Sequence, residues 1–238
     1  MRTEFRHPAL LACLLLAGCA TVQAPAIDAV SAMTHARTGH AIQQLPPGEP
    51  APAITQLPTA DSAVQAAFAN HRALQSALAE LDIAAADLAQ ASRPRNPGFS
   101  FGKLRDGEIE RAVTFDLFGL LTLPLRREIE RGRVDHTAAR TALAAVTLAT
   151  QAKLAWYDAV AAAQTVQYME QAASAAQAAA ELSERMARAG NASKLDQLRE
   201  QSFYAETMAQ LERAKLAKVA AREALNRALG LAEDSGYA

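Results

Sequence analysis

The sequence has few aromatic residues, little cysteine and no excess of positive charge. Aromatic side chains make up 5% of the 238 residues, which is too few bulky groups to fill a thick globular core. A formal net charge of −1 provides no basic surface for nucleic acid. The chain also lacks a glycine-rich phosphate loop, a nucleophile motif and a cluster of metal ligands. The sequence therefore predicts no enzyme and no catalytic, cofactor-binding or metal-binding residues.

Alanine is what the chain has in abundance, with 58 residues. Alanine is the strongest helix former, and its methyl group lets helices approach closely without a thick layer of side chains between them. The composition therefore predicts a mainly α protein built from long, thinly packed helices.

The first residues of the chain have the features of an export signal. Arg2 and Arg6 precede an apolar run at 9–17, which is too short to span a bilayer as a helix. The run ends in the letters LAGC at Cys19, which looks like a bacterial lipoprotein signal peptide over residues 1–18. Cleavage there would leave Cys19 as an acylated N-terminus, and the following Ala20 implies outer-membrane sorting by resemblance to other lipoproteins. The alternative is an ordinary secretory signal with a chance cysteine.

Residues 19–58 are predicted to be a linker that follows the acylated cysteine. Most of the ten prolines of the chain lie in this segment or at its end, and little helical or strand periodicity is visible between them.

A helix is predicted over residues 61–93, before prolines 94 and 97 end it. Its residues follow alternating steps of four and three, the spacing of a coiled-coil seam. The seam consists of Ala67, His71, Leu74, Leu78, Leu81, Ala85 and Leu88. His71 is expected to be a packed, hydrogen-bonded histidine on this seam.

Residues 98–118 change to the two-residue period of strands and predict a β-hairpin. Its apolar face is predicted to contain Phe99, Phe101, Val113, Phe115 and Leu117. The second run, at 109–119, has about the length of a tilted transmembrane strand, roughly 9–11 residues. A single hairpin cannot span a membrane with unpaired edges. It would therefore close a barrel with other hairpins or be a soluble surface ribbon, and the sequence leaves both open.

Two further helices are predicted at 126–189 and 195–229, with a sharp reversal between them. The long helix has about 64 residues and a length of about 96 Å, close to that of the helices at 61–93 and 195–229 stacked end to end. One long helix beside two half-length helices would form a uniform wall about 100 Å tall. The hairpin at 98–118 would lie at one end of the wall and the reversal at the other.

Several runs in this order resemble the TolC-type outer-membrane efflux proteins, particularly their lipoprotein branch, over residues 61–232. The runs are ANHRALQSALAELDIAAADLAQASRPRNPGFSF, FDLFGLLTLPLRREIE, LAWYDAVAAAQ, RMARAGNASKLDQL and ALNRALGLAE. The resemblance implies long antiparallel coiled-coil helices that form a periplasmic α-barrel wall. It also implies that the β-hairpin contributes to an outer-membrane β-barrel.

The resemblance further implies that the helical reversal contacts a periplasmic adaptor protein coupled to an inner-membrane pump. The corresponding residues at this tip are Arg185, Arg188, Gly190, Asn191 and Ser193. An alternative role for the two arginines is to complement the dipole at a helix C-terminus, and the two roles are compatible. The transported substrate does not follow from the resemblance.

The chain departs from the family pattern, because it contains one repeat where family members have two. Six copies of the chain, a separately encoded second half-chain, or a truncated remnant would each account for this. The alternative functions are a periplasmic adaptor-like protein and a structural coiled-coil lipoprotein. The favoured interpretation is a lipid-anchored outer-membrane channel component of an efflux or export system.

Overall fold

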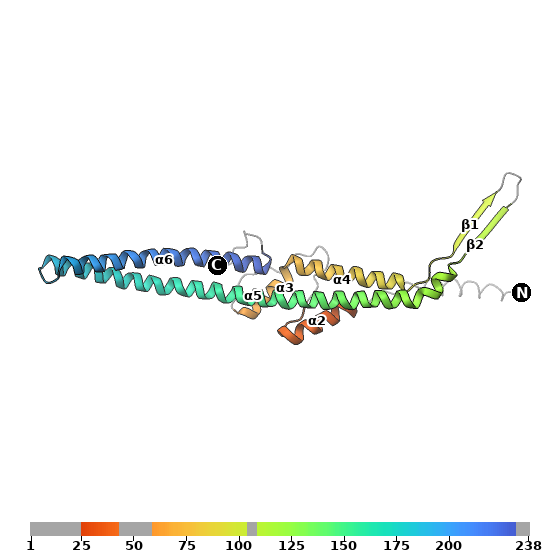
Figure 1. Ribbon diagram of the computed structural model, residues 1–238, viewed down its shortest axis with the longest axis horizontal. Helices are drawn as coiled ribbons and strands as arrows, with labels where there is room; N and C mark the ends of the chain where they lie inside the picture. The colour runs from red at the N-terminus through yellow and green to blue at the C-terminus, as the bar shows by residue number, and fades with distance from the viewer. Residues whose placement is uncertain (1–24, 43–58, 104–108, 232–238) are drawn as a thin grey trace, which may run out of the picture. The chain divides into compact units, whose positions relative to one another are not determined.

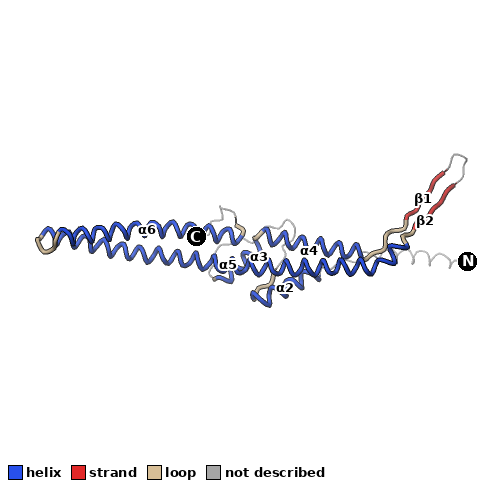
Figure 2. Tube along the Cα trace, viewed as in Figure 1, coloured by secondary structure: helices blue, strands red, loops and turns tan. Residues whose placement is uncertain are grey.

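The computed structural model describes residues 25–42, 59–103 and 109–231, and Figure 1 shows these elements in chain order. The helices and strands are α2 (Pro25–Thr38), α3 (Ala60–Asn70), α4 (Arg72–Ala91), β1 (Gly98–Lys103), β2 (Ile109–Thr114), α5 (Leu117–Arg188) and α6 (Lys194–Leu229). Figure 2 shows that helices dominate and that the two strands form a single hairpin. The predicted fold class, long helices with one β-hairpin, is confirmed. Cys19 and the predicted signal peptide lie outside the described residues.

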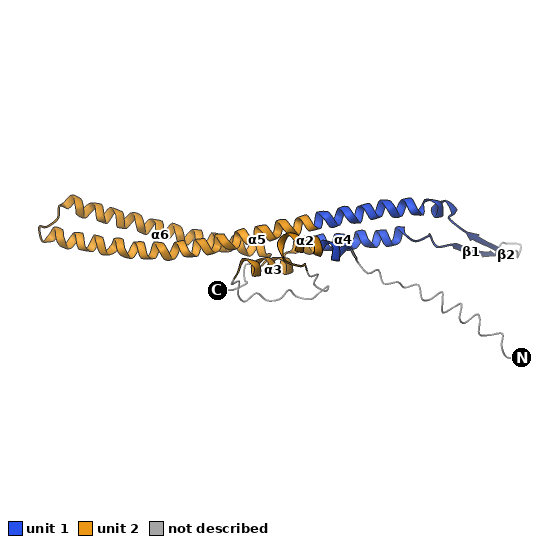
Figure 3. Ribbon diagram, turned by 90° about the horizontal axis from the view of Figure 1, so that it is seen from below, with its two compact units in different colours: residues 1–30, 77–141 blue, residues 31–76, 142–238 orange. Residues whose placement is uncertain are grey.

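The chain divides into two compact units, coloured separately in Figure 3. The first unit contains the described part of residues 1–30 together with 77–141, and so includes the hairpin. The second contains residues 31–76 and 142–238, again as far as they are described, and so includes the helical reversal. The helices α2, α4 and α5 each contribute to both units.

In the first unit, α4 lies beside the N-terminal part of α5. The Thr141 hydroxyl donates to the Ala77 carbonyl at 3.3 Å, and Arg140 pairs with Glu80. Five of the side chains buried in this unit come from these two helices: Leu78, Leu81, Val134, Ala138 and Thr141. Four of the predicted seam residues are buried in the structure, namely Ala67, Leu74, Leu78 and Leu81.

In the second unit, α6 packs along the C-terminal part of α5. The buried cluster there consists of Val166, Ala173 and Leu211, with Met169 and Met208 packed against it. Many of the other residues of α5 that are buried in this unit are alanines, among them Ala145, Ala149, Ala152, Ala176 and Ala180. Packing through such small side chains is what the alanine-rich composition predicts.

The helix predicted at 61–93 is wrong in one respect, because it breaks at His71. α3 ends at Asn70, and His71 has an extended backbone (φ −74°, ψ 110°) before α4 begins. Side chains satisfy the last carbonyls of α3: Asn70 donates to Ala66 at 2.8 Å, and Gln75 donates to Phe68 at 3.1 Å. His71 Nδ1 is buried and has no hydrogen-bond partner among the described residues. The sequence predicted that His71 is hydrogen-bonded and lies on a continuous helix. The helix instead breaks at this residue, and its Nδ1 has no hydrogen bond to a described residue.

The break is where the end of α6 meets α3. Gly230 adopts a left-handed conformation (φ +73°), and a Cβ added there would lie 2.7 Å from the Cα of His71 and 3.0 Å from the carbonyl oxygen of Asn70. The two backbones are therefore in direct contact. No local sequence signal marks this contact, because the residues are far apart in the chain.

The predicted linker at 19–58 is also corrected, because α2 occupies Pro25–Thr38 within it. Pro25 stands at the first helical position, where its missing N–H costs nothing. After the helix ends, His40 Nε2 lies 3.2 Å from Asp61 Oδ1, and Lys153 Nζ lies 3.0 Å from the same oxygen. Hydrogen bonds from Lys153 and then from His40 lower the pKa of the Asp61 carboxyl. Part of the proline-rich segment is thus bound to the helices.

The long helix begins nine residues earlier than predicted, and the hairpin is shorter. Asp116 Oδ1 accepts the backbone N–H of Gly119 at 2.7 Å, so it caps the first turn of α5, which starts at Leu117. Pro124 consequently lies inside the helix rather than at its start. The Leu120 carbonyl loses its usual N–H donor there, and the ribbon of α5 is bent near this end in Figure 1.

Gly132→Ala is expected to stabilise the protein by about 0.5–1 kcal/mol, because glycine in a helix interior costs backbone entropy. Gly132 lies within α5, and a Cβ placed there meets no atom within 4 Å. Thermal unfolding followed by helical circular dichroism would measure the gain. An unchanged or lower midpoint temperature of unfolding would contradict this prediction and would indicate that another chain packs against Gly132 in the assembled protein.

Candidate functional site

The reversal between α5 and α6 is a tight turn centred on Gly190. Gly190 has a φ of +79°. Its N–H bonds to the Ala187 carbonyl at 3.1 Å, and the Asn191 N–H bonds to the Met186 carbonyl at 2.9 Å. This pair of bonds is a Schellman motif, which ends a helix with a left-handed residue, usually glycine. The structure therefore brings four of the five predicted tip residues into one compact turn or its flanking helix end.

Ser193, the fifth, is the N-cap of α6. Its hydroxyl oxygen accepts the Asp196 backbone N–H at 3.1 Å, and the hydroxyl donates to the Asp196 carboxylate at 2.6 Å. The hydrogen bond from Ser193 is the main reason that the pKa of Asp196 is lowered. The negative charge also lies at the positive end of the α6 dipole. The turn is thus closed by a C-cap on one side and an N-cap on the other.

Arg185 and Arg188 lie in the last turn of α5 and are exposed. Arg185 Nη2 is 3.8 Å from Glu181 Oε2, and Arg188 Nη2 is 3.5 Å from Glu184 Oε1. Exposed pairs of this kind contribute about 0.2–1 kcal/mol, so both guanidinium groups can exchange their partner at little cost. The positions near the helix C-terminus also suit the dipole.

Sequence reasoning named only polar and small residues at the tip and missed the apolar ones. Large apolar side chains near the reversal are exposed: Leu182 (59%), Met186 (41%), Leu195 (57%) and Leu198 (49%). The sequence could have revealed them, because these apolar residues lie close to Gly190 on both sides of the reversal. The tip therefore exposes large apolar side chains as well as charged ones.

Ser193→Ala is expected to weaken the start of α6 by about 1 kcal/mol, the usual effect of losing a serine N-cap. The effect should depend on pH. Asp196 has a lowered pKa when folded, so its bond from Ser193 stabilises the fold above the ordinary aspartate pKa and is lost as the pH falls through the lowered value. Amide-exchange protection in the first turn of α6 should therefore differ most between wild type and variant at neutral pH. Equal protection at neutral pH would contradict the capping role.

The β-hairpin presents two different faces. Its antiparallel register pairs Phe99 with Val113 and Phe101 with Arg111, and directly paired residues share a face. Ser100 pairs with Ala112 on the opposite face. Three predicted lipid-facing residues, Phe99, Phe101 and Val113, are therefore on one face, and all strand residues are exposed.

Phe115 and Leu117 are not on the strand, which corrects part of the predicted strand. β2 ends at Thr114, and Leu117 is the first residue of α5. The apolar surface nevertheless continues into the helix. Its exposed members after the strand include Phe115 (64%), Leu117 (71%), Phe118 (81%), Leu121 (82%) and Leu125 (59%). The alternation of apolar and polar residues predicted a longer strand. The strand ends at Thr114, because Asp116 caps the helix that follows.

Within the described ranges, no helix combines the length and apolar character needed to cross a lipid bilayer. Across the same residues, histidine, cysteine, aspartate and glutamate side chains do not gather in groups of three or more that could hold a metal ion.

Two solved structures have a similar fold. A membrane protein from Pseudomonas aeruginosa matches with a TM-score of 0.60 at 18% identity, over 82% of this chain and 52% of that protein. The CmeC outer membrane channel of Campylobacter jejuni matches with a TM-score of 0.54 at 15% identity, over 74% of this chain and 41% of that protein. The fold is shared with an outer-membrane channel.

The chain spans about half of the length of the matched Pseudomonas aeruginosa protein and less of CmeC. No protein-family model and no curated protein sequence matches the chain. At these identities the likeness establishes the fold, and it confirms the fold expected from the TolC-type resemblance.

Proposed function

We propose that this chain is a TolC-type component of an outer-membrane channel that passes small molecules from the periplasm to the exterior. In this role it serves an efflux or export system with a periplasmic adaptor and an inner-membrane pump. The observation that carries the proposal is the fold shared with CmeC, a long helical hairpin with a β-hairpin at the other end of its long helix.

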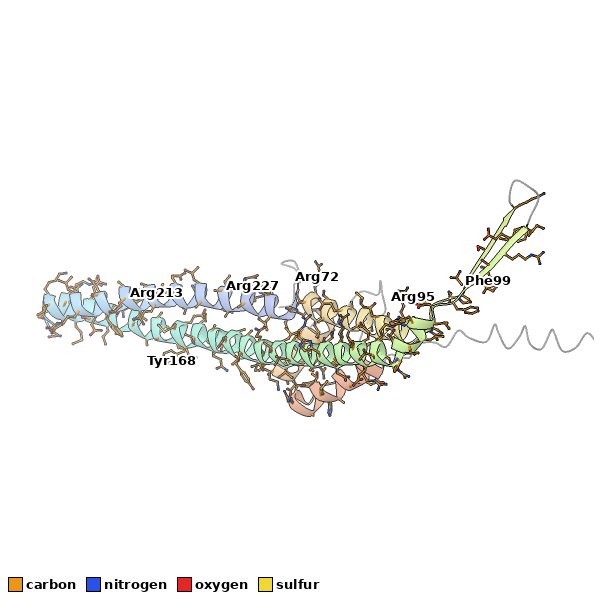
Figure 4. The ribbon with its side chains drawn as sticks, turned by 45° about the vertical axis from the view of Figure 1, so that its right-hand side comes forward. Arg72, Arg95, Phe99, Tyr168, Arg213 and Arg227 are labelled. Carbon is orange, nitrogen blue, oxygen red and sulfur yellow. The ribbon has the colours of Figure 1, made fainter. Side chains whose placement is uncertain are left out.

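The hairpin supports this proposal through its exposed apolar face. Phe99 and Phe101 are 79% and 71% exposed, and Figure 4 labels Phe99 on the hairpin. Large aromatic groups exposed on an isolated two-stranded ribbon are unfavourable in water. In the proposed channel they face lipid, and hairpins from several chains pair their edges in one barrel.

Assembly is proposed to bury apolar side chains along the long helices of the second unit. Exposed examples on α5 and α6 are Leu154 (59%), Tyr168 (69%), Phe203 (58%), Leu216 (71%) and Val219 (61%), with Tyr168 labelled in Figure 4. A helix with apolar residues outside its intramolecular seam needs another partner. Neighbouring copies, six in a closed ring, or a second half-chain would supply that partner and form the α-barrel wall.

The tip at Gly190 is proposed to contact the adaptor. Arg185 and Arg188 would exchange their intrahelical glutamates for acidic or carbonyl groups of the adaptor, while Asn191 and Ser193 present polar groups at the turn. The exposed Leu195 and Leu198 would add apolar contact area. Crosslinking from cysteine-substituted tip residues to the adaptor would test this contact.

The proposed function is tested by the assembly and phenotype of the full-length protein. We expect the protein, extracted from outer membranes in mild detergent, to give ring-shaped particles in class averages. Deleting its gene should raise intracellular accumulation of exported compounds. A strictly monomeric protein whose deletion leaves accumulation unchanged would overturn the proposal.

Lipidation is proposed at Cys19, and Cys19→Ser is expected to abolish it. The variant should lose labelling by a fatty-acid analogue and accumulate as an uncleaved precursor, because the modified cysteine directs cleavage at residue 18. Gel mobility and metabolic labelling would measure both changes. Wild-type protein without acyl chains would refute the lipid anchor and leave the channel proposal standing.

A further inference from the structure

We infer that arginines at the base of the β-hairpin form a binding site for the phosphate of anionic phospholipid headgroups. The inference rests on the proposed function, since it requires the hairpin to enter a membrane. The site lies wholly in the first unit, where α4, the hairpin and the start of α5 meet. We call its members the basic collar: Arg93, Arg95, Arg126, Arg127 and Arg131.

The basic collar follows directly after the exposed apolar surface. Along α5 the closely spaced exposed apolar residues run to Leu125, and Arg126 and Arg127 come next, with a further exposed apolar side chain at Ile129. On the other side of the hairpin, Arg95 precedes Phe99 by four residues, and Figure 4 labels both near the hairpin base. Arginine beside an apolar band is suited to the headgroup level, where its stem contacts acyl chains and its guanidinium contacts phosphate.

Folding brings the two segments of the collar together. Three collar members, Arg93 and Arg95 after α4 and Arg126 on α5, line one open groove with a volume of about 1070 Å³. Arg133, which is not a member of the collar, also lines it. Carboxylates also reach this groove: Asp82, Asp87 and Glu130. Glu130 is occupied by Arg133 at 3.0 Å, and Asp82 and Asp87 precede the collar along α4 by at least six residues.

The guanidinium of Arg126 is held in place and keeps donors for a ligand. One of its Nη2 hydrogens is bound to the Gly119 carbonyl. Its Nε is buried and has no hydrogen-bond partner within the part of the chain that the structure describes. Arginine has five N–H donors in a fixed fork that matches phosphate. Arg126 lines the groove, so an oxygen from a headgroup phosphate there would accept a hydrogen bond from its remaining Nη donors rather than from the buried Nε.

The local charge also favours an anion. Residues 93–96 and 115–133 contain six arginines and three carboxylates, a difference of +3, and adding Asp82 and Asp87 of the groove leaves +1, whereas the whole chain carries −1. Arg95 Nε contacts Asp116 Oδ2 at 3.7 Å. Arg93, Arg127 and Arg131 make no ion pair with any other residue in the described ranges. A lipid headgroup, fixed at the depth of the collar, fits this distribution better than a free anion, because the apolar band adjoins it.

The test is lipid binding by the full-length protein, extracted in mild detergent and followed by native mass spectrometry. Dioleoylphosphatidylglycerol and dioleoylphosphatidylcholine are titrated separately. We expect tighter binding of the anionic lipid, weakened by salt. Arg93→Gln combined with Arg127→Gln should reduce anionic-lipid affinity about 25-fold, since each arginine near an anionic surface contributes about 5-fold. Arg126→Gln alone should also reduce it and leave phosphatidylcholine binding unchanged.

The matched control is Arg213→Gln combined with Lys218→Gln on α6, which removes two exposed cations far from the collar in sequence and should leave both lipid affinities unchanged. Three outcomes would overturn the inference: full anionic preference in the collar variant, displacement of the lipid by millimolar inorganic phosphate, or loss of oligomers in the collar variant, which would place the arginines between copies. The fraction of wild-type protein in outer membranes is measured in parallel. Its absence there would refute the proposed function itself, whereas membrane insertion without lipid preference would refute only the collar.

Discussion

Gly230→Ala is expected to lower the free energy of unfolding by about 2–5 kcal/mol. Two costs add. A side chain in the left-handed conformation costs about 1–2 kcal/mol, and forcing an atom into a packed contact costs about 1–3 kcal/mol more. The contact is with backbone, since the new Cβ would stand 2.7 Å from the Cα of His71. A backbone atom cannot rotate away as a side chain can.

Gly190→Ala is the matched control for this prediction. Gly190 has nearly the same φ, +79° against +73°, but a Cβ there meets no atom within 4 Å. It should therefore cost only the conformational term of about 1–2 kcal/mol. Denaturant unfolding followed by circular dichroism would measure both variants, and amide exchange around residues 66–75 should increase only in the Gly230 variant. Equal destabilisation by the two substitutions would refute the contact between α6 and the break at His71.

Val113→Arg is expected to disfavour membrane insertion by about 2–4 kcal/mol if the residue stands near the bilayer midplane. Val113 lies directly opposite Phe99, and the same face carries Phe101 and its partner Arg111, one pair further along the hairpin. In the proposed channel this face meets lipid, where a guanidinium loses its hydration. The amount of folded protein recovered in the outer-membrane fraction would measure the loss, with the remainder degraded or aggregated in the periplasm.

Ala112→Arg is the control, because Ala112 is the adjacent residue at nearly the same depth and points to the opposite face with Ser100. We expect its effect to be small, since a lumen-facing arginine keeps its water. A comparable loss from both substitutions would argue that the hairpin is a soluble ribbon. The absence of any loss from either substitution would also indicate a soluble ribbon. Either result would contradict the proposal that the hairpin enters the membrane.

Long helices and their ends were predictable from the sequence because their causes are local. A long alanine-rich stretch without proline favours uninterrupted helix, and Gly190 followed by Ser193 supplies a C-cap and an N-cap within four residues. The alternation around Phe99 and Val113 likewise predicts a hairpin with one apolar face, because the strand period is set by the backbone. These features depend on near neighbours in the chain, which the sequence displays directly.

Other features were decided only by contacts between distant segments. The break at His71 coincides with the approach of Gly230 from far along the chain. Asp61, in the first turn of α3, contacts both His40, which precedes α3, and Lys153, which lies on α5. The end of β2 is a further example, because Asp116 could have continued the alternation of the strand or capped a helix. Its carboxylate accepts the backbone N–H of Gly119, so it caps α5 and the strand ends before it. The basic collar likewise exists because folding places Arg93 and Arg126 on the same groove. Periodicity reports which face of an element is apolar, whereas only the tertiary structure determines which distant backbone or charge meets that element.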